Sequence, residues 1–150
     1  MIYKGYELPK LLPGKLVKRY KRFLADVELE TSEIVTAHCP NSGSMRGCAT
    51  PGDPVWISQS DNPKRKLNYT WELIQTKDSM IGVNTIIPNR LVKASIENGL
   101  VDELKAYTKV TAEIKTSDHT RLDLLLENET GRACYVEIKN CTLVEKGVAM

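Results

Sequence analysis

Residues 121–139 read RLDLLLENETGRACYVEIK, and this stretch decides the fold of the second half of the chain. Two mostly apolar runs flank the segment Asn128–Arg132, in which Gly131 can adopt the positive φ that a tight turn requires. Within the two runs every even position is apolar, whereas the charged residues occupy odd positions. Because side chains alternate between faces along a strand, the pattern predicts a β-hairpin with an apolar back and a charged front.

The charged front of this hairpin brings two acids together. If the turn centres on Thr130, Asp123 lies opposite Glu137 and Arg121 lies opposite Lys139, an unfavourable pairing of like charges. A divalent cation between the carboxylates would offset the repulsion, and carboxylate oxygens suit Mg²⁺ (or Mn²⁺). We therefore expect Asp123 and Glu137 as metal ligands, with Lys139 holding a water or a phosphate oxygen. The alternative is an ordinary solvated face, since a one-residue change in the turn would alter the register.

The same residues resemble the core of the PD-(D/E)XK nucleases, in which an Asp and a Glu-x-Lys lie on adjacent strands. The match here is Asp123 with Glu137-Ile138-Lys139, although Leu122 stands where the motif has proline. The resemblance implies a metal-dependent nuclease with Asp123, Glu137 and Lys139 as catalytic residues. Glu113 or Glu97 is a candidate for an additional acid.

The segment that precedes the hairpin has mixed character. Pro88 suits the first turn of a helix, and the apolar spacing over residues 89–98 followed by Gly99 predicts a helix with a glycine cap. A strand is expected over residues 109–116. Residues 81–150 are therefore predicted to form the start of a mixed α/β domain.

Residues 1–80 have a different pattern, one of short strands and turns. Strands are expected over residues 15–29, 33–39, 55–58 and 66–76. Short strands separated by turns indicate a small closed barrel, for which the oligonucleotide-binding (OB) barrel is the commonest solution. The overall prediction is an α+β protein: an OB-like barrel over residues 1–80, followed by the nuclease-like domain.

Positive charge is concentrated at the front of the chain. Residues 1–25 hold seven lysines and arginines and a single acid, although the net charge of the whole chain is only +2. Lysine and arginine neutralise phosphates, and interleaved aromatics can stack on bases. We therefore expect a DNA interface formed by Lys18, Arg19, Lys21, Arg22, Lys64, Arg65 and Lys66. The alternative is a solvated barrel face with Tyr20 and Phe23 in the core.

Several other classes of protein are disfavoured by the sequence. No apolar run is long enough to span a membrane, and the first residues do not resemble a secretion signal, which predicts a cytoplasmic protein with reduced thiols. The spacing of His38, Cys39 and Cys48 fits the usual zinc patterns poorly. A catalytic triad using His38 or His119 is disfavoured, because no nucleophile-elbow motif is present.

Taken together, these stretches resemble the sugar fermentation stimulation protein A (SfsA) family. The resemblance is carried by residues 17–27, His38–Met45, Gly47–Cys48, Pro51–Asp53, Val55–Trp56, Tyr69–Leu73, Val83–Thr85, Asn89–Leu91, Arg121–Asp123 and Tyr135–Asn140. It implies an OB barrel, a nuclease-like domain, DNA binding without strong sequence preference and a role in regulating sugar (maltose) metabolism. Because members of the family continue beyond the position of Met150, we expect the second domain to be truncated. DNA binding without catalysis and metal-dependent cleavage both remain open, whereas a sugar-binding regulator has no specific residue support.

Overall fold

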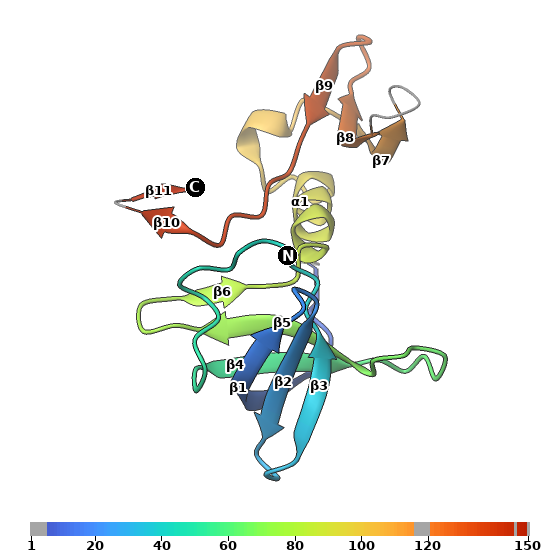
Figure 1. Ribbon diagram of the computed structural model, residues 1–150. Helices are drawn as coiled ribbons and strands as arrows, with labels where there is room; N and C mark the ends of the chain where they lie inside the picture. Colours follow the sequence, from blue (N-terminus) through green and yellow to red (C-terminus); the bar gives the residue numbers. More distant parts are fainter. Residues whose placement is uncertain (1–5, 116–120, 146, 150) are drawn as a thin grey trace. The chain divides into compact units, whose positions relative to one another are not determined.

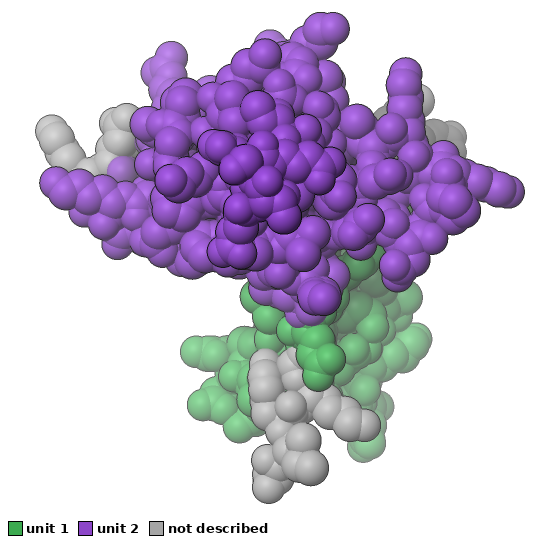
Figure 2. Space-filling model, turned by 90° about the horizontal axis from the view of Figure 1, so that it is seen from below, with its two compact units in different colours: residues 1–7, 86–140 green, residues 8–85, 141–150 purple. Residues whose placement is uncertain are grey.

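The computed structural model describes residues 6–115, 121–145 and 147–149. The chain divides into two compact units, shown in different colours in Figure 2. One unit, the barrel unit, consists of residues 8–85 with 141–150, and the other, the sheet unit, consists of residues 1–7 with 86–140. The sequence analysis placed the boundary after residue 80.

The barrel unit is a closed five-stranded barrel (Figure 1), built from β1 (Leu11–Tyr20), β2 (Leu24–Leu29), β3 (Ile34–His38), β4 (Pro54–Gln59) and β5 (Tyr69–Gln75). Strand β1 pairs with both β2 and β4, and β2 pairs with β3. Strands β4 and β5 pair, and a parallel pairing of β3 with β5 closes the barrel. The expected OB-like architecture is confirmed. Strand β6 (Met80–Gly82) extends the sheet beside β5, and β10 (Val144–Glu145) pairs with β11 (Val148–Ala149).

The single long strand expected over residues 15–29 is wrong. The chain turns at residues 21–23, which separates β1 from β2. Lys21 and Arg22 adopt φ angles of 50° and 63°, the left-handed region that side chains other than glycine rarely occupy. The sequence conceals this turn, because lysine and arginine are not residues that mark a turn with two positive φ angles.

Apolar side chains from every barrel strand fill the core. The largest fully buried ones include Trp71, Leu16, Ile57 and Ile74. Gly14 is required where β1 pairs closely with β2, because a Cβ at this position would lie 2.6 Å from Val27 Cγ1 and 2.7 Å from the Glu28 carbonyl oxygen. Replacement of the glycine would therefore force the two strands apart.

The sheet unit contains α1 (Ile87–Glu97), a short 3-10 turn η1 (Asp102–Leu104) and a three-stranded antiparallel sheet. The sheet consists of β7 (Lys109–Lys115), β8 (Arg121–Glu127) and β9 (Ala133–Val136), in that order. Pro88 lies in the first turn of α1, and Gly99 follows its end with a φ of 68°, as the sequence predicted. Ile96 of the helix packs with Leu124 and Leu126 of β8, so the even positions of the hairpin form its buried face.

Candidate functional site

The hairpin of β8 and β9 has the register that the sequence predicted. Leu124 pairs with Val136, and Leu126 pairs with Cys134. The turn is closed by a hydrogen bond from the Asn128 N–H to the Arg132 carbonyl, and Gly131 has a φ of 79°. The next residues outward from the last pair are Asp123 and Glu137, so the strand register directs the two acids to the same end of the hairpin.

The return strand is shorter than expected, since β9 ends at Val136 rather than continuing to Lys139. The physical reason lies in the carboxylate of Asp123. Its Oδ2 atom accepts the Ile138 backbone N–H at 2.7 Å, so that donor bonds to a side chain instead of to a strand neighbour. This bond fixes Glu137 and Lys139 next to Asp123.

Asp123, Glu137 and Lys139 form what we call the carboxylate site. The Lys139 ammonium pairs with Glu137 Oε1 at 2.5 Å. The hydrogen bond and the charge of Glu137 raise the pKa of Lys139, and the Asp123 carboxylate adds to the effect. Lys139 therefore lies in the field of both acids and stays a cation at neutral pH.

The sequence analysis did not identify Asn89 as part of this site. The Asn89 amide in the first turns of α1 donates to Asp123 Oδ1 at 2.8 Å, so both oxygens of this carboxylate are held. Asn89 is thus a positioning residue that joins α1 to β8. Its place directly after Pro88, in a segment that carries the family resemblance, does not identify a partner on a distant strand.

The other charged residues considered for this site have partners elsewhere. Arg121 ion-pairs with Glu113 of β7 at 3.5 Å, so it is not held opposite Lys139. Glu113 has a φ of 55° and falls between the paired residues Ala112 and Ile114. Glu97 pairs with Lys93 on the exposed side of α1.

Asp123 and Glu137 match the preferences of a hard divalent cation in their chemistry. Both offer carboxylate oxygens, and Mg²⁺ is commonly held by one or two carboxylates together with water. Within the described ranges, no group of three or more His, Cys, Asp and Glu side chains is arranged to hold a metal. The two acids therefore fit a cation that keeps most of its water shell, and they do not form a closed protein cage.

The predicted DNA-binding cations fall into two groups in the barrel unit. Lys21 and Arg22 form the tip of the β1–β2 hairpin, and Lys64, Arg65 and Lys66 lie in the loop between β4 and β5. Strand pairing places the two groups at the same end of the barrel. Leu24, the first residue of β2, pairs with His38 at the end of β3, and His38 pairs with Thr70 near the start of β5. Arg65 donates to Thr70 Oγ1 at 3.1 Å, which anchors the loop at this end of the barrel. We call these five cations the cationic rim.

Two of the predicted DNA-binding residues have structural partners instead. The Arg19 Nη2 atom donates to the carbonyls of Arg22, Asn41 and Gly43, each at 2.9 Å. Among the described residues its Nε is buried and has no hydrogen-bond partner. Lys18 pairs with Asp26 at 3.4 Å. Arg19 thus connects the hairpin turn to the loop that follows β3.

Asp26 is the centre of a small polar network on the outside of the barrel. It accepts hydrogen bonds from Thr36 at 2.8 Å and from Tyr20 at 3.1 Å, besides its pair with Lys18. Burial acts to raise the pKa of Asp26, but the bonds from Thr36, Tyr20 and Lys18 and the Lys18 charge together hold it below its ordinary value. Tyr20 is therefore tied into the barrel, in contrast to its neighbour Phe23.

The lowered pKa of Asp26 gives an expected pH dependence. Because the folded pKa lies below the unfolded value of about 3.9, the stabilising effect is complete above that value and is lost as pH falls through the folded pKa. We expect Asp26→Asn to lower the free energy of unfolding by about 1–2 kcal/mol at pH 7, with the gap closing below pH 4. Urea unfolding at several pH values measures this, with the exposed Glu28→Gln on the same strand as control. A gap that stays constant down to pH 3 would contradict the assignment.

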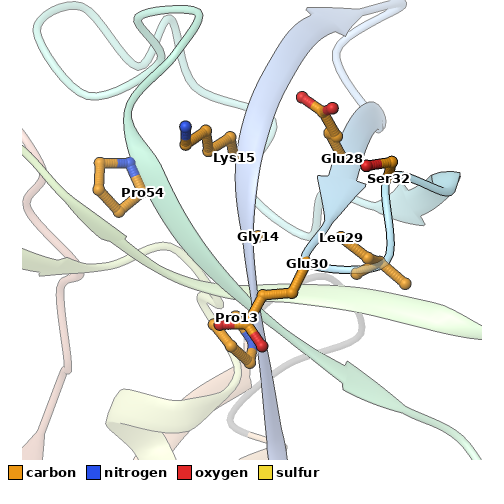
Figure 3. Close-up of a pocket in the computed structure, with 8 residues that line it drawn as sticks. All are labelled: Pro13, Gly14, Lys15, Glu28, Leu29, Glu30, Ser32 and Pro54. Atoms are coloured by element: carbon orange, nitrogen blue, oxygen red, sulfur yellow. The ribbon is translucent and has the colours of Figure 1, made fainter.

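The opposite end of the barrel is acidic and holds a shallow groove (Figure 3). The groove has a volume of about 430 Å³ and is lined by Pro13, Gly14, Lys15, Glu28, Leu29, Glu30, Ser32 and Pro54. With two carboxylates and one ammonium, its lining repels a phosphate. The barrel is therefore polarised between a cationic rim and an acidic end.

The two buried cysteines belong to the core of the loop after β3. Cys39 and Cys48 are free thiols, and Cys39 Sγ contacts Met45 Sδ at 3.6 Å. Burial raises the pKa of the Cys48 thiol. These cysteines act as small apolar side chains.

Comparison with known proteins agrees with this architecture. The SfsA N-terminal OB domain matches residues 17–83, and the sugar fermentation stimulation protein RE domain matches residues 86–150. The sugar fermentation stimulation protein homologue of Geotalea uraniireducens is 60% identical over 135 residues, which cover 90% of this chain and 58% of that protein. The homologue of Geobacter metallireducens is 57% identical, with the same coverage of 90% and 58%.

A solved structure shares the fold. The structure of Pyrococcus furiosus SfsA in complex with Ca²⁺ superimposes with a TM-score of 0.75 at 23% identity, covering 89% of this chain and 56% of that one. The fold and the matches define an α+β protein with an N-terminal OB domain. The chain belongs to the sugar fermentation stimulation protein family. It spans less than two thirds of the length of these relatives. In the part of the chain that the structure describes, no helix is both long enough and apolar enough to cross a bilayer.

Proposed function

We propose that this protein binds DNA without strong sequence preference, and that the cationic rim is the binding surface. The observation that carries the proposal is that strand pairing gathers Lys21, Arg22 and residues 64–66 at one end of the barrel. The acids Glu28, Glu30 and Glu33 lie at the other end, around the β2–β3 turn. A polyanion is attracted to the first end and repelled from the second.

Weak sequence preference follows from the kind of contact that the rim offers. Lysine and arginine on turns neutralise phosphates, which carry no sequence information. The name of the relatives, sugar fermentation stimulation protein homologue, links them to sugar fermentation. We therefore propose that DNA binding is the biochemical activity behind a regulatory role in sugar metabolism, and that it takes place in the cytoplasm.

The rim is tested by removing cations without disturbing the turn. Lys21→Asn combined with Arg22→Gly places residues that tolerate positive φ at both turn positions, so the variant is expected to fold at least as stably. Each phosphate contact contributes about 0.9 to the slope of log affinity against log salt, so loss of two contacts flattens the slope by about 1.8 on duplex DNA. Gel-shift titrations at several salt concentrations measure both affinity and slope.

The matched control removes two exposed lysines far from the rim, Lys15→Asn with Lys77→Asn. Lys15 lies on β1 at the acidic groove, and Lys77 lies in the turn that follows β5. The control is expected to keep the slope of the unmodified protein. If the rim variant and the control give the same affinity and slope, DNA binds elsewhere.

A second function, metal-dependent cleavage of DNA, is favoured by the carboxylate site. The specific observation is the pair of bonds that hold Asp123 beside Glu137 and Lys139. Asp123 and Glu137 would hold a cation such as Mg²⁺ or Mn²⁺, which polarises a phosphoryl oxygen and lowers the pKa of a bound water. The Pyrococcus furiosus relative was solved with Ca²⁺, another hard cation that takes oxygen ligands. Lys139 would orient the water or place positive charge next to the phosphate.

A further inference from the structure

Phe23 is an exposed aromatic side chain at the tip of the β1–β2 hairpin. It is 51% exposed and directly follows the two rim cations Lys21 and Arg22. The other aromatic of this stretch, Tyr20, is partly buried and donates its hydroxyl to Asp26. The two aromatics therefore have different roles: Tyr20 stabilises the barrel, and Phe23 presents an apolar ring to solvent next to the cations Lys21 and Arg22.

The backbone around Phe23 is held in one conformation. The Phe23 carbonyl accepts the Cys39 N–H at 2.7 Å, and the Arg22 carbonyl accepts Arg19 Nη2 at 2.9 Å. Lys21 and Arg22 are kept in the left-handed region despite the steric cost of their side chains there. Such strain persists where the surrounding contacts over-determine a conformation, often at binding sites. The backbone that carries Phe23 is thus preorganised.

The surroundings of Phe23 favour a nucleic-acid base over a protein partner. An aromatic ring offers a face for stacking, and the adjacent cations complement the phosphates on both sides of a stacked nucleotide. Ile34 supplies the contrast: it is 61% exposed on the same sheet, but at the acidic end, next to Glu33. Exposed apolar surface at that end lies beside carboxylates, which repel a polyanion.

We propose that Phe23 stacks on an unpaired base, so that the cationic rim binds single-stranded DNA more tightly than duplex DNA. The proposal rests on the proposed DNA-binding function and names its substrate class. In a duplex the base faces are covered by their neighbours, so only the phosphate contacts of the cationic rim are available. In a single strand the same cations hold the backbone while a base lies on the ring.

The test compares one labelled oligonucleotide as a single strand and as a duplex by fluorescence anisotropy at fixed salt. Phe23→Ala is expected to weaken single-strand binding by roughly 5- to 150-fold, the range found for loss of one base stack. Duplex affinity is expected to change less than twofold. Phe23→Leu, which keeps apolar volume without an aromatic face, is expected to behave like Phe23→Ala. Ile34→Ala is the matched control and is expected to bind both oligonucleotides normally.

The variant Lys21→Asn with Arg22→Gly distinguishes DNA binding by the rim from stacking by Phe23. It is expected to weaken binding of both single-stranded and duplex DNA. If it does so while Phe23→Ala leaves single-strand affinity unchanged, or weakens both complexes equally, stacking by Phe23 is wrong and DNA binding by the rim stands. If neither variant changes either affinity, the rim itself is wrong. Thermal unfolding of each variant verifies that the barrel is folded during the measurement.

Discussion

Lys139→Ala is expected to slow metal-dependent DNA cleavage strongly in a chain of the full length of the relatives, while binding of DNA and of Mn²⁺ persists. Lys139 is 77% exposed and forms an ion pair with Glu137, so its removal leaves the fold intact. A positioned cation acts mainly on the charge that develops in the transition state, so its loss affects turnover more than binding. We expect a decrease of about 10²–10³-fold in the rate of cleavage, measured on a labelled duplex with Mn²⁺.

Glu137→Gln is the companion variant and is expected to lose cleavage by a different route. It removes one of the two acids that would hold the cation, so calorimetry should show weakened Mn²⁺ binding. Glu97→Gln and Glu113→Gln are matched controls, because these acids pair with Lys93 and Arg121 instead of contributing to the carboxylate site. Equal cleavage by the unmodified protein and Lys139→Ala would assign any activity to a contaminant. Absence of cleavage with every divalent metal would contradict the nuclease function, and the β8–β9 hairpin would then be only a structural scaffold.

Arg19→Ala is expected to lower the free energy of unfolding by about 2–4 kcal/mol, a large effect for one residue on the surface of a barrel. The guanidinium satisfies three carbonyls, two of them in the loop after β3, and these acceptors lose their partner in the variant. Lys18→Ala is the adjacent control. Its side chain is 61% exposed, and we expect a loss below about 1 kcal/mol.

Urea unfolding gives the stability of both variants, and DNA titration separates the two roles considered for Arg19. The sequence predicts that Arg19 contacts DNA, whereas its hydrogen bonds make it a clamp between the hairpin turn and the loop. If Arg19→Ala unfolds at the same urea concentration as the unmodified protein but binds DNA poorly, the clamp is unimportant and the contact with DNA is direct.

The parts of the structure that the sequence predicted well are those governed by strong local rules. Alternation of apolar residues and a turn with Gly131 were enough to set the register of β8 and β9, because a shift by one residue would expose Leu124 and Leu126. In the same way, Pro88 and Gly99 marked the two ends of α1. Each of these signals acts within a few residues along the chain.

The features that the sequence did not predict depend on contacts between distant segments. The bond from Asn89 to Asp123 joins a helix to a strand, and no local pattern encodes it. The turn at Lys21 and Arg22 lacks turn-forming residues, and it is held by Arg19 and by the Cys39 N–H, which lies beyond two strands. The early end of β9 has the same origin, because a side chain on β8 takes the N–H of Ile138.

The parallel pairing of β3 with β5 also constrains the order in which the barrel unit assembles. Strands β1, β2 and β3 are joined by short turns, so their pairing requires little loop closure. The seam between β3 and β5 pairs His38 with Thr70 and so joins segments distant in the sequence, which makes it a non-local contact with a higher loop-closure cost than the β1–β2 and β2–β3 hairpins. Until the seam forms, the hairpin tip and the loop of residues 64–66 are separate basic segments. The complete cationic rim therefore exists only in molecules whose barrel has closed.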